Sequence, residues 1–267
     1  MAALIYPQID PIIFAIGPFA VRWYGLAYVA GFIIAIAIVA SLNRRWEVGL
    51  SEDHLLSMFL YGSLGLVIGA RVGYMLIYAF PQLISDPLSL VRTTEGGMSF
   101  HGGLAGIIAA GYLLSRRIGI PLSRLADLVA VGAPAGIFFG RLANFINGEL
   151  WGRVTEAPWG MVFPGAGPLP RHPSQLYEAF LEGVVLLVVM LILARRKRPD
   201  GEMLGWLLTL YAVFRFMVEF VREPDPHLGA VLGALSMGQV LTLPVFAAGV
   251  WLLWRARAAS ESGTGRA

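Results

Sequence analysis

The stretch LADLVAVGAPAGIFFGRLANFINGELWG, residues 125–152, begins as an almost unbroken run of small and apolar residues and ends with polar ones. The run is long enough to cross a bilayer core of roughly 30 Å as a helix, which needs about 20 residues. Near its end stand Arg141, Asn144 and Glu149. An ionisable side chain inside such a run is costly unless it faces a partner or a wet cavity. The stretch therefore indicates a membrane helix that carries part of a functional site.

The rest of the chain has the same character. Of its 267 residues 57% are hydrophobic and only 14% are charged, and the mean hydropathy is +0.70, which excludes an ordinary soluble domain. The apolar runs are too long and too uniform to be barrel strands, which alternate over about ten positions. We predict an all-α integral membrane protein whose seven transmembrane helices lie at about residues 23–42, 55–80, 98–114, 125–146, 175–194, 203–221 and 236–254.

The basic residues between these helices predict the orientation. If the chain alternates through seven spans, most of them fall on one side: Arg44, Arg45, Arg116, Arg117, Arg124, Arg195, Arg196, Lys197, Arg198, Arg255, Arg257 and Arg266. The other side holds Arg22, Arg92, Arg153, Arg171 and Arg222. By the positive-inside rule the N-terminus is outside and the C-terminus is cytoplasmic. The basic loops are then topology signals, and we expect no binding of nucleic acid despite the net charge of +3.

The domain organisation follows from this topology. We predict a single polytopic membrane domain over residues 1–267, with external loops at residues 81–97 and 147–173 and a cytoplasmic tail at 258–267. Residues 1–20 lack a basic start and are interrupted by prolines, so we expect an external interfacial segment rather than a signal peptide. The long external loops are typical of an outer surface that handles substrate.

Polar side chains gather in the outer halves of the spans. Arg71, Arg141 and Arg215 lie inside apolar stretches, at most roughly 10 Å below the outer surface at 1.5 Å per residue. Other polar residues share this depth: Tyr24, His101, Asn144, Glu178, Tyr211 and Glu219. Three arginines need more hydrogen-bond acceptors than one Glu provides, so an anionic ligand is the simpler source of those acceptors. The pattern predicts a charged cavity in the outer leaflet, covered by the external loops.

Several motifs leave a structural and a functional interpretation open. Tyr211, Arg215 and Glu219 are four apart on one helical face, so the last two could simply neutralise each other. In EGGMSFHGGLAG, Gly102 and Gly106 favour close helix packing, while His101 at a helix start could move a proton. In RHPSQLYEAF, capping is the expected role of Pro173 and Ser174, whereas His172 and Glu178 could be structural or functional.

Some chemistries are excluded or not indicated. The chain has no cysteine, so a disulfide, a thiolate metal site and a cysteine nucleophile of its own are excluded. Its four histidines show no metal-ligand spacing, and no phosphate-binding loop for a nucleotide is present. We expect neither a metal nor a cofactor.

The motifs together resemble one family. GRLANFINGELWG matches the G-R-x-x-N-F-x-N-x-E-x-x-G signature of the prolipoprotein diacylglyceryl transferases of bacterial inner membranes. The chain also resembles that family at RWYGLAY from Arg22, SFHGGLAG from Ser99, RHPSQLYE from Arg171 and FRFMVEFVREPD from Phe214. The similarity runs from about residue 22 to 225, and the segment 153–170 matches no family motif.

This resemblance implies a reaction and a place for it. The diacylglyceryl group of phosphatidylglycerol would pass to the lipobox cysteine thiol of a prolipoprotein signal peptide, forming a thioether and releasing glycerol phosphate. The protein would lie among the lipids of the inner membrane with its active site on the periplasmic side.

The implied roles of the residues follow the chemistry. Arg141 and Arg215 would hold the lipid phosphate, and His101 and Tyr211 would handle the proton. Asn144, Glu149 and Tyr24 would bind and position the glycerol headgroup, and Gly152 would lie in a turn that lets the chain approach closely. The supporting residues would be Arg71, His172, Glu178 and Glu219.

Two other functions stay open at this stage. A transporter or flippase for an anionic lipid or solute would also need buried cations, although transporters place their substrate near the midplane between repeated halves. No convincing repeat is evident. A scaffold whose polar groups only join helices would not need three arginines at one depth.

Overall fold

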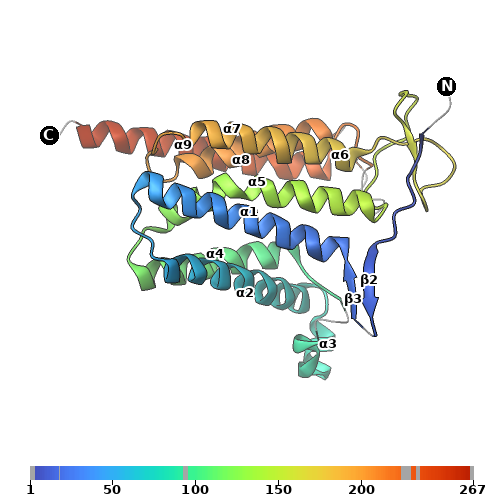
Figure 1. Cartoon of the computed structure of the whole chain (residues 1–267), viewed down its shortest axis with the longest axis horizontal. Coiled ribbons are helices and arrows are strands. Elements are labelled where there is room, and N and C mark those ends of the chain that lie inside the picture. The colour runs from blue at the N-terminus through green and yellow to red at the C-terminus, as the bar shows by residue number, and fades with distance from the viewer. Residues whose placement is uncertain (1–3, 18, 93–95, 224–229, 233–234, 265–267) are drawn as a thin grey trace. The chain divides into compact units, whose positions relative to one another are not determined.

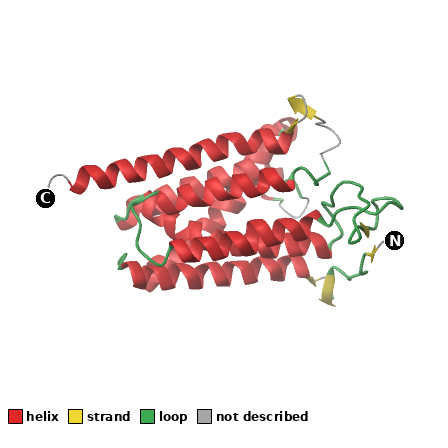
Figure 2. Cartoon of the chain, turned by 90° about the horizontal axis from the view of Figure 1, so that it is seen from above, coloured by secondary structure: helices red, strands yellow, loops and turns green. Residues whose placement is uncertain are grey.

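The computed structural model describes residues 4–17, 19–92, 96–223, 230–232 and 235–264. Within these ranges the protein is helical, with only short two-stranded sheets (Figure 2). This confirms the all-helical class. The chain divides into two compact units, residues 1–46 with 127–267 and residues 47–126.

All seven apolar stretches expected from the sequence are helical. The main helices are α1 (Trp23–Trp46), α2 (Glu52–Ile77), α4 (Phe100–Ile118), α5 (Leu122–Ile146), the continuous α6 (Ser174–Glu178), η3 (Ala179–Val185) and α7 (Leu186–Leu193), α8 (Glu202–Val218) and α9 (Met237–Thr264). Among the described residues, five helices are long and apolar enough to cross a membrane: Trp23–Trp46, Glu52–Ile77, Leu122–Ile146, Ser174–Leu193 and Met237–Glu261. The chain is thus a membrane protein by the length and composition of its helices.

The remaining elements are short. They are α3 (Phe80–Ser85), the 3₁₀ helix η1 (Pro87–Val91), and the strands β1 (Leu4–Ile5), β2 (Ile12–Ile16), β3 (Phe19–Arg22), β4 (Met161–Val162), β5 (Ala230–Leu232) and β6 (Leu235–Ser236). The strands pair as β1 with β4, β2 with β3, and β5 with β6.

In the larger unit, small residues let helices approach closely. α8 and α9 run side by side (Figure 1), and a Cβ on Gly249 would lie 2.5 Å from Thr209 Oγ1. A Cβ on Gly31 of α1 would lie 3.0 Å from the Cα of Gly136 on α5. Close backbone approach through small residues is how membrane helices gain packing energy where lipid removes the hydrophobic drive.

The smaller unit is built on the pair α2 and α4 (Figure 1). A Cβ on Gly73 of α2 would lie 2.6 Å from the Cα of Gly102, and one on Gly69 would lie 2.7 Å from the Cα of Gly106. The packing role predicted for the glycines after His101 is therefore confirmed.

The C-terminal end of α5 is held by the N-terminal segment. β1 pairs in parallel with β4, and the Tyr6 hydroxyl lies 2.6 Å from the carbonyl oxygen of Phe145 and 2.7 Å from that of Ile146. The last carbonyls of a helix lack partners within the helix, so Tyr6 satisfies them and fixes the point where α5 ends.

Candidate active site

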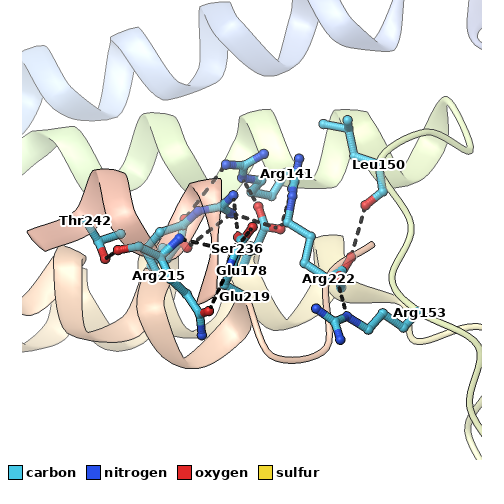
Figure 3. A network of polar contacts seen from close by, with 12 residues as sticks. Arg141, Leu150, Arg153, Glu178, Arg215, Glu219, Arg222, Ser236 and Thr242 are labelled. Atoms are coloured by element: carbon cyan, nitrogen blue, oxygen red, sulfur yellow. Dashed lines mark hydrogen bonds and ion pairs between the residues drawn. The ribbon is translucent and has the colours of Figure 1, made fainter. Parts of the chain in front are cut away.

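A cluster of charged side chains lies in the larger unit (Figure 3). We call it the charged cluster, and its members are Arg141 from α5, Glu178 from α6, Glu182 from η3, Arg215 from α8, Glu219 at the end of α8, and Arg222 just beyond it. Residues far apart in the sequence meet here because α5, α6 with η3, and α8 each turn one face toward the same point.

Glu178 is the centre of the charged cluster. Its carboxylate is fully buried and contacts three guanidinium groups: Oε2 lies 2.6 Å from Arg141 Nε, and Oε1 lies 2.9 Å from Arg222 Nη1 and 3.3 Å from Arg215 Nη1. A buried carboxylate needs such partners, because removing an ion from water costs several kcal/mol. Glu178 therefore fixes the three arginines around one point.

Arg215 is also paired within its own helix. Its Nη2 lies 2.9 Å from Glu219 Oε2, and the Ser236 hydroxyl donates to Glu219 Oε1 at 3.1 Å. The four-residue spacing thus produces the pair allowed for by the sequence, and Glu178 adds a second carboxylate. The protein itself supplies carboxylates to both Arg141 and Arg215, so these two arginines are neutralised without an anionic ligand.

The three arginine side chains keep a small exposed surface. The side chains of Arg141, Arg215 and Arg222 are 21%, 14% and 14% exposed. Arg141 contacts Glu178 through Nε, and its Nη atoms make no hydrogen bond to the described residues, with Nη2 3.9 Å from Glu182 Oε2. A guanidinium has five donors, so Arg141 can hold its partner and bind an anion at the same time.

The turn after α5 forms a second polar group. Asn144 donates through Nδ2 to Glu149 Oε1 at 2.8 Å, and Asn147 donates to the same oxygen at 3.3 Å. Gly148 has a φ of +66°, so it ends the helix in the left-handed conformation that glycine adopts without strain, as the sequence allowed. Gln175 Nε2 donates to the Glu149 carbonyl oxygen at 2.5 Å, which ties this turn to α6.

Gly152 lies where three chain segments meet. Its amide donates to the carbonyl oxygen of His172 at 2.8 Å, and it forms an isolated bridge with Arg222. A Cβ added here would lie 2.8 Å from His172 Cβ and would also overlap the carbonyl oxygen of Val221. The close approach predicted for Gly152 is confirmed.

His172 belongs to a separate group on the loop. Its Nδ1 lies 3.1 Å from the Tyr177 hydroxyl, which also accepts from Trp159 Nε1 at 2.7 Å. Burial lowers the pKa of the His172 imidazole. The cap expected of Ser174 is wrong, because its hydroxyl donates to the Leu150 carbonyl oxygen at 3.0 Å and no side chain caps α6.

Two tyrosines approach the charged groups. Tyr211 on α8 lies within electrostatic range of Arg141, Arg215 and Glu182. Tyr24, at the start of α1, is within range of Arg141 and Glu149, and its hydroxyl lies 3.2 Å from that of Tyr28 on the next turn. The structure thus gathers most predicted residues of the larger unit around the charged cluster and the turn after α5. His172 lies against Gly152, and its imidazole contacts Tyr177.

The remaining two predicted residues are in the smaller unit. Arg71 is buried, and its guanidinium donates to the backbone carbonyls of Ser89, Leu90, Arg92, Gly96 and Gly97. Its acceptors are therefore backbone carbonyls of the loop between α2 and α4 of its own unit, and Arg71 holds that loop in place. His101 is exposed in the first turn of α4, which Ser99 caps through the amide of Gly102 at 3.2 Å.

Sequence reasoning missed two members of the charged cluster. Arg222 was counted among the external basic residues, and it lies beyond the end of α8 at Val218, so no helical spacing marked it. Glu182 stands four residues after Glu178, which indicates a shared face. The partners that this face meets were not visible in the sequence.

These features define a multi-pass membrane protein with a buried, charge-balanced cluster that can bind an anion. The family model of prolipoprotein diacylglyceryl transferase matches residues 11–255. Two curated relatives named phosphatidylglycerol–prolipoprotein diacylglyceryl transferase come from Allorhizobium ampelinum, at 49% identity over 98% of this chain and 94% of the relative, and from Nitratidesulfovibrio vulgaris, at 48% identity over 98% of both. A relative of the same name from Geobacter sulfurreducens is 49% identical over 92% of this chain and 94% of its own. The chain belongs to the prolipoprotein diacylglyceryl transferase family.

Proposed function

We propose that this protein transfers the diacylglyceryl group of phosphatidylglycerol to the cysteine thiol of a prolipoprotein lipobox, forming a thioether and releasing glycerol phosphate. The observation that carries the proposal is the charged cluster: Arg141, Arg215 and Arg222 converge on the buried Glu178 while their side chains stay partly exposed. A phosphodiester can bind there through charge-assisted hydrogen bonds.

The chemistry needs stabilisation of a leaving phosphate. Sulfur attacks the glyceryl carbon, the C–O bond breaks, and negative charge grows on the phosphate oxygen. Guanidinium groups already in place stabilise that charge without reorganising, which is the largest single contribution in many enzymes. Arg141 and Arg215 take this role, and Glu178 and Glu219 hold them.

Other predicted residues take up the headgroup and the proton. Asn144 and Glu149 are already hydrogen-bonded to each other and present a donor and an acceptor suited to glycerol hydroxyls. Tyr24 lies within electrostatic range of Arg141 and Glu149, and Tyr211 lies within electrostatic range of the charged cluster. For His101 the proposal rests on the motif around it and on its exposed place in the first turn of α4: a neutral imidazole can accept the thiol proton.

The direct test is product formation. The purified protein is incubated with phosphatidylglycerol and a lipobox peptide, and mass spectrometry detects the peptide with a diacylglyceryl thioether. A peptide with serine in place of the cysteine is the control and should stay unmodified. A transporter or flippase would move lipid across vesicles without changing either substrate, and that outcome would refute the proposal. Loss of product in both His101→Gln and Arg141→Ala would further support residues 1–267 acting as one polytopic domain.

We also propose seven transmembrane helices in the bacterial inner membrane, with the N-terminus and the site on the periplasmic side and the C-terminus in the cytoplasm. The basic loops then lie in the cytoplasm, as the positive-inside rule requires. Because the chain has no cysteine, single cysteines can report topology. With a maleimide that cannot cross membranes, Glu156→Cys should react in intact spheroplasts and Lys197→Cys only after lysis; the reverse result would invert the topology.

A further inference from the structure

One carboxylate of the charged cluster is poorly partnered. Glu182 is fully buried, and neither of its carboxylate oxygens has a hydrogen bond among the described residues. Its nearest cationic atoms are Arg141 Nη2 at 3.9 Å and Arg215 Nη1 at 4.0 Å, beyond hydrogen-bonding distance. By contrast, Glu178 and Glu219 have cationic partners at 2.6 and 2.9 Å.

The backbone holds Glu182 in this position. It lies in the middle of η3, a π-helical segment, and such segments often occur at functional sites. A Cβ on the adjacent Gly183 would lie 2.7 Å from Phe138 Cβ, so η3 packs tightly against α5. The titratable and charged groups that face Glu182 are Arg141 from α5, Glu178 from α6, Tyr211 and Arg215 from α8, and Arg222.

The charge of the cluster makes Glu182 important when a ligand binds. Without a ligand, the three arginines and three glutamates of the cluster cancel in formal charge. A phosphodiester adds one negative charge to a buried site, where an uncompensated charge is costly. Uptake of a proton by a carboxylate removes that excess. The carboxylate with the weakest partners is the easiest to protonate, and that is Glu182.

We infer that Glu182 takes up a proton when the phosphate of the donor lipid binds, and passes it to the phosphate oxygen released as the C–O bond breaks. This inference rests on the proposed function. In the step, the S–C bond forms, the C–O electron pair goes to the phosphate oxygen, and the proton of Glu182 bonds to that oxygen. The thiol proton leaves to the base of the site, so the transfer is balanced: one proton is lost by the thiol and one is gained by the product.

The variant Glu182→Gln separates this role from a structural one. The amide is neutral, like the protonated acid, and cannot release a proton, so the KM for phosphatidylglycerol should change little while kcat falls by roughly 10²-fold, a typical general-acid contribution. The wild-type rate should decline at alkaline pH as Glu182 loses its proton in the complex, and E182Q should lack that decline. The matched control is Glu202→Gln, which removes a buried carboxylate paired with Arg198 elsewhere in the unit.

Two results with E182Q would overturn the inference. One is a rate close to that of the wild type at every pH. The other is a raised KM with an unchanged pH profile, which would make Glu182 a structural counter-charge only.

A second measurement does not depend on the variant folding. Calorimetry of wild-type protein with phosphatidylglycerol in detergent micelles, without peptide, is repeated in buffers of different ionisation enthalpy. We expect uptake of about one proton per bound lipid, because adding a negative charge favours the protonated form of a neighbouring acid. Binding without proton uptake would overturn the inference while leaving the proposed function intact, since that function is judged by thioether formation in the wild type.

Discussion

In the proposed mechanism, Arg141 performs two tasks that lysine cannot combine: it pairs with Glu178 and binds the lipid phosphate. Its Nε contacts Glu178 Oε2 at 2.6 Å, while its Nη atoms make no hydrogen bond to the described residues and the side chain is 21% exposed. A lysine has one compact ammonium group on a flexible stem. In Arg141→Lys that group can neutralise Glu178 or reach the phosphate, but it cannot do both with the same geometry.

The expected losses follow from the contacts removed. Arg141→Ala removes a donor to the developing phosphate charge, which costs on the order of 3 kcal/mol, or about a hundredfold in rate. It also leaves the buried Glu178 with one cation fewer, so the loss should reach this value or exceed it. Arg141→Lys keeps the charge but loses the several N–H donors of the guanidinium group. One hydrogen bond to a charged group is worth about 1.5–3 kcal/mol, so we expect a decrease in kcat/KM of roughly tenfold to hundredfold.

The assay measures kcat/KM for thioether formation on a lipobox peptide, with each variant purified and placed in phosphatidylglycerol-containing nanodiscs. Arg45→Ala is the matched control, because Arg45 is an exposed arginine in the last turn of α1. Correct folding is checked by comparing the thermal unfolding of the variants with that of the wild type. If Arg141→Lys retained the wild-type kcat/KM, a phosphate clamp at this position would be refuted and Arg141 would be only a partner for Glu178.

Three further predictions concern the surroundings of the site. Gly152→Ala should lower Tm and abolish most activity, because the added Cβ overlaps Val221 and overpacking costs about 1–3 kcal/mol; an unchanged Tm and rate would contradict the close approach. Arg71→Ala should speed tryptic cleavage after Arg92, because the loop loses the side chain that donates hydrogen bonds to several of its carbonyls. Cleavage at the wild-type rate would show that the loop keeps its conformation without Arg71. Burial lowers the pKa of His172, so the folded protein favours the neutral imidazole. The contribution of this imidazole to the free energy of unfolding is therefore present above the ordinary histidine pKa of about 6.5 and is lost as the pH falls below it. Tm should therefore fall less between pH 7 and 5 in His172→Gln than in the wild type, and equal losses would exclude this contribution.

The helices could be predicted closely from the sequence. The stretch expected at residues 125–146 is α5 (Leu122–Ile146), and that expected at 23–42 is α1 (Trp23–Trp46). Hydropathy is a local property, and a backbone embedded in lipid must satisfy its own hydrogen bonds. An apolar run of this length must therefore form a helix. The same reasoning located Arg141 and Arg215, because a cation within an apolar run is visible without its partners.

The partners of those cations could not be predicted in the same way. Arg71 and Arg141 look alike in the sequence, yet one binds the carbonyls of its own loop and the other binds Glu178. Glu182 shares a helical face with Glu178 by its spacing and Arg222 follows the end of α8, but which groups meet there depends on packing between helices.

Hydropathy and motifs along the chain are enough to recognise a helical membrane protein, its family motifs and the places where charge enters its apolar stretches. The convergence of three arginines on Glu178, and the absence of a hydrogen bond from Glu182 to the described residues, are seen only once the helices are packed. Burial and helix formation depend on neighbours along the chain, whereas the pairing of charges depends on distances of a few ångströms between helices, which the sequence does not state.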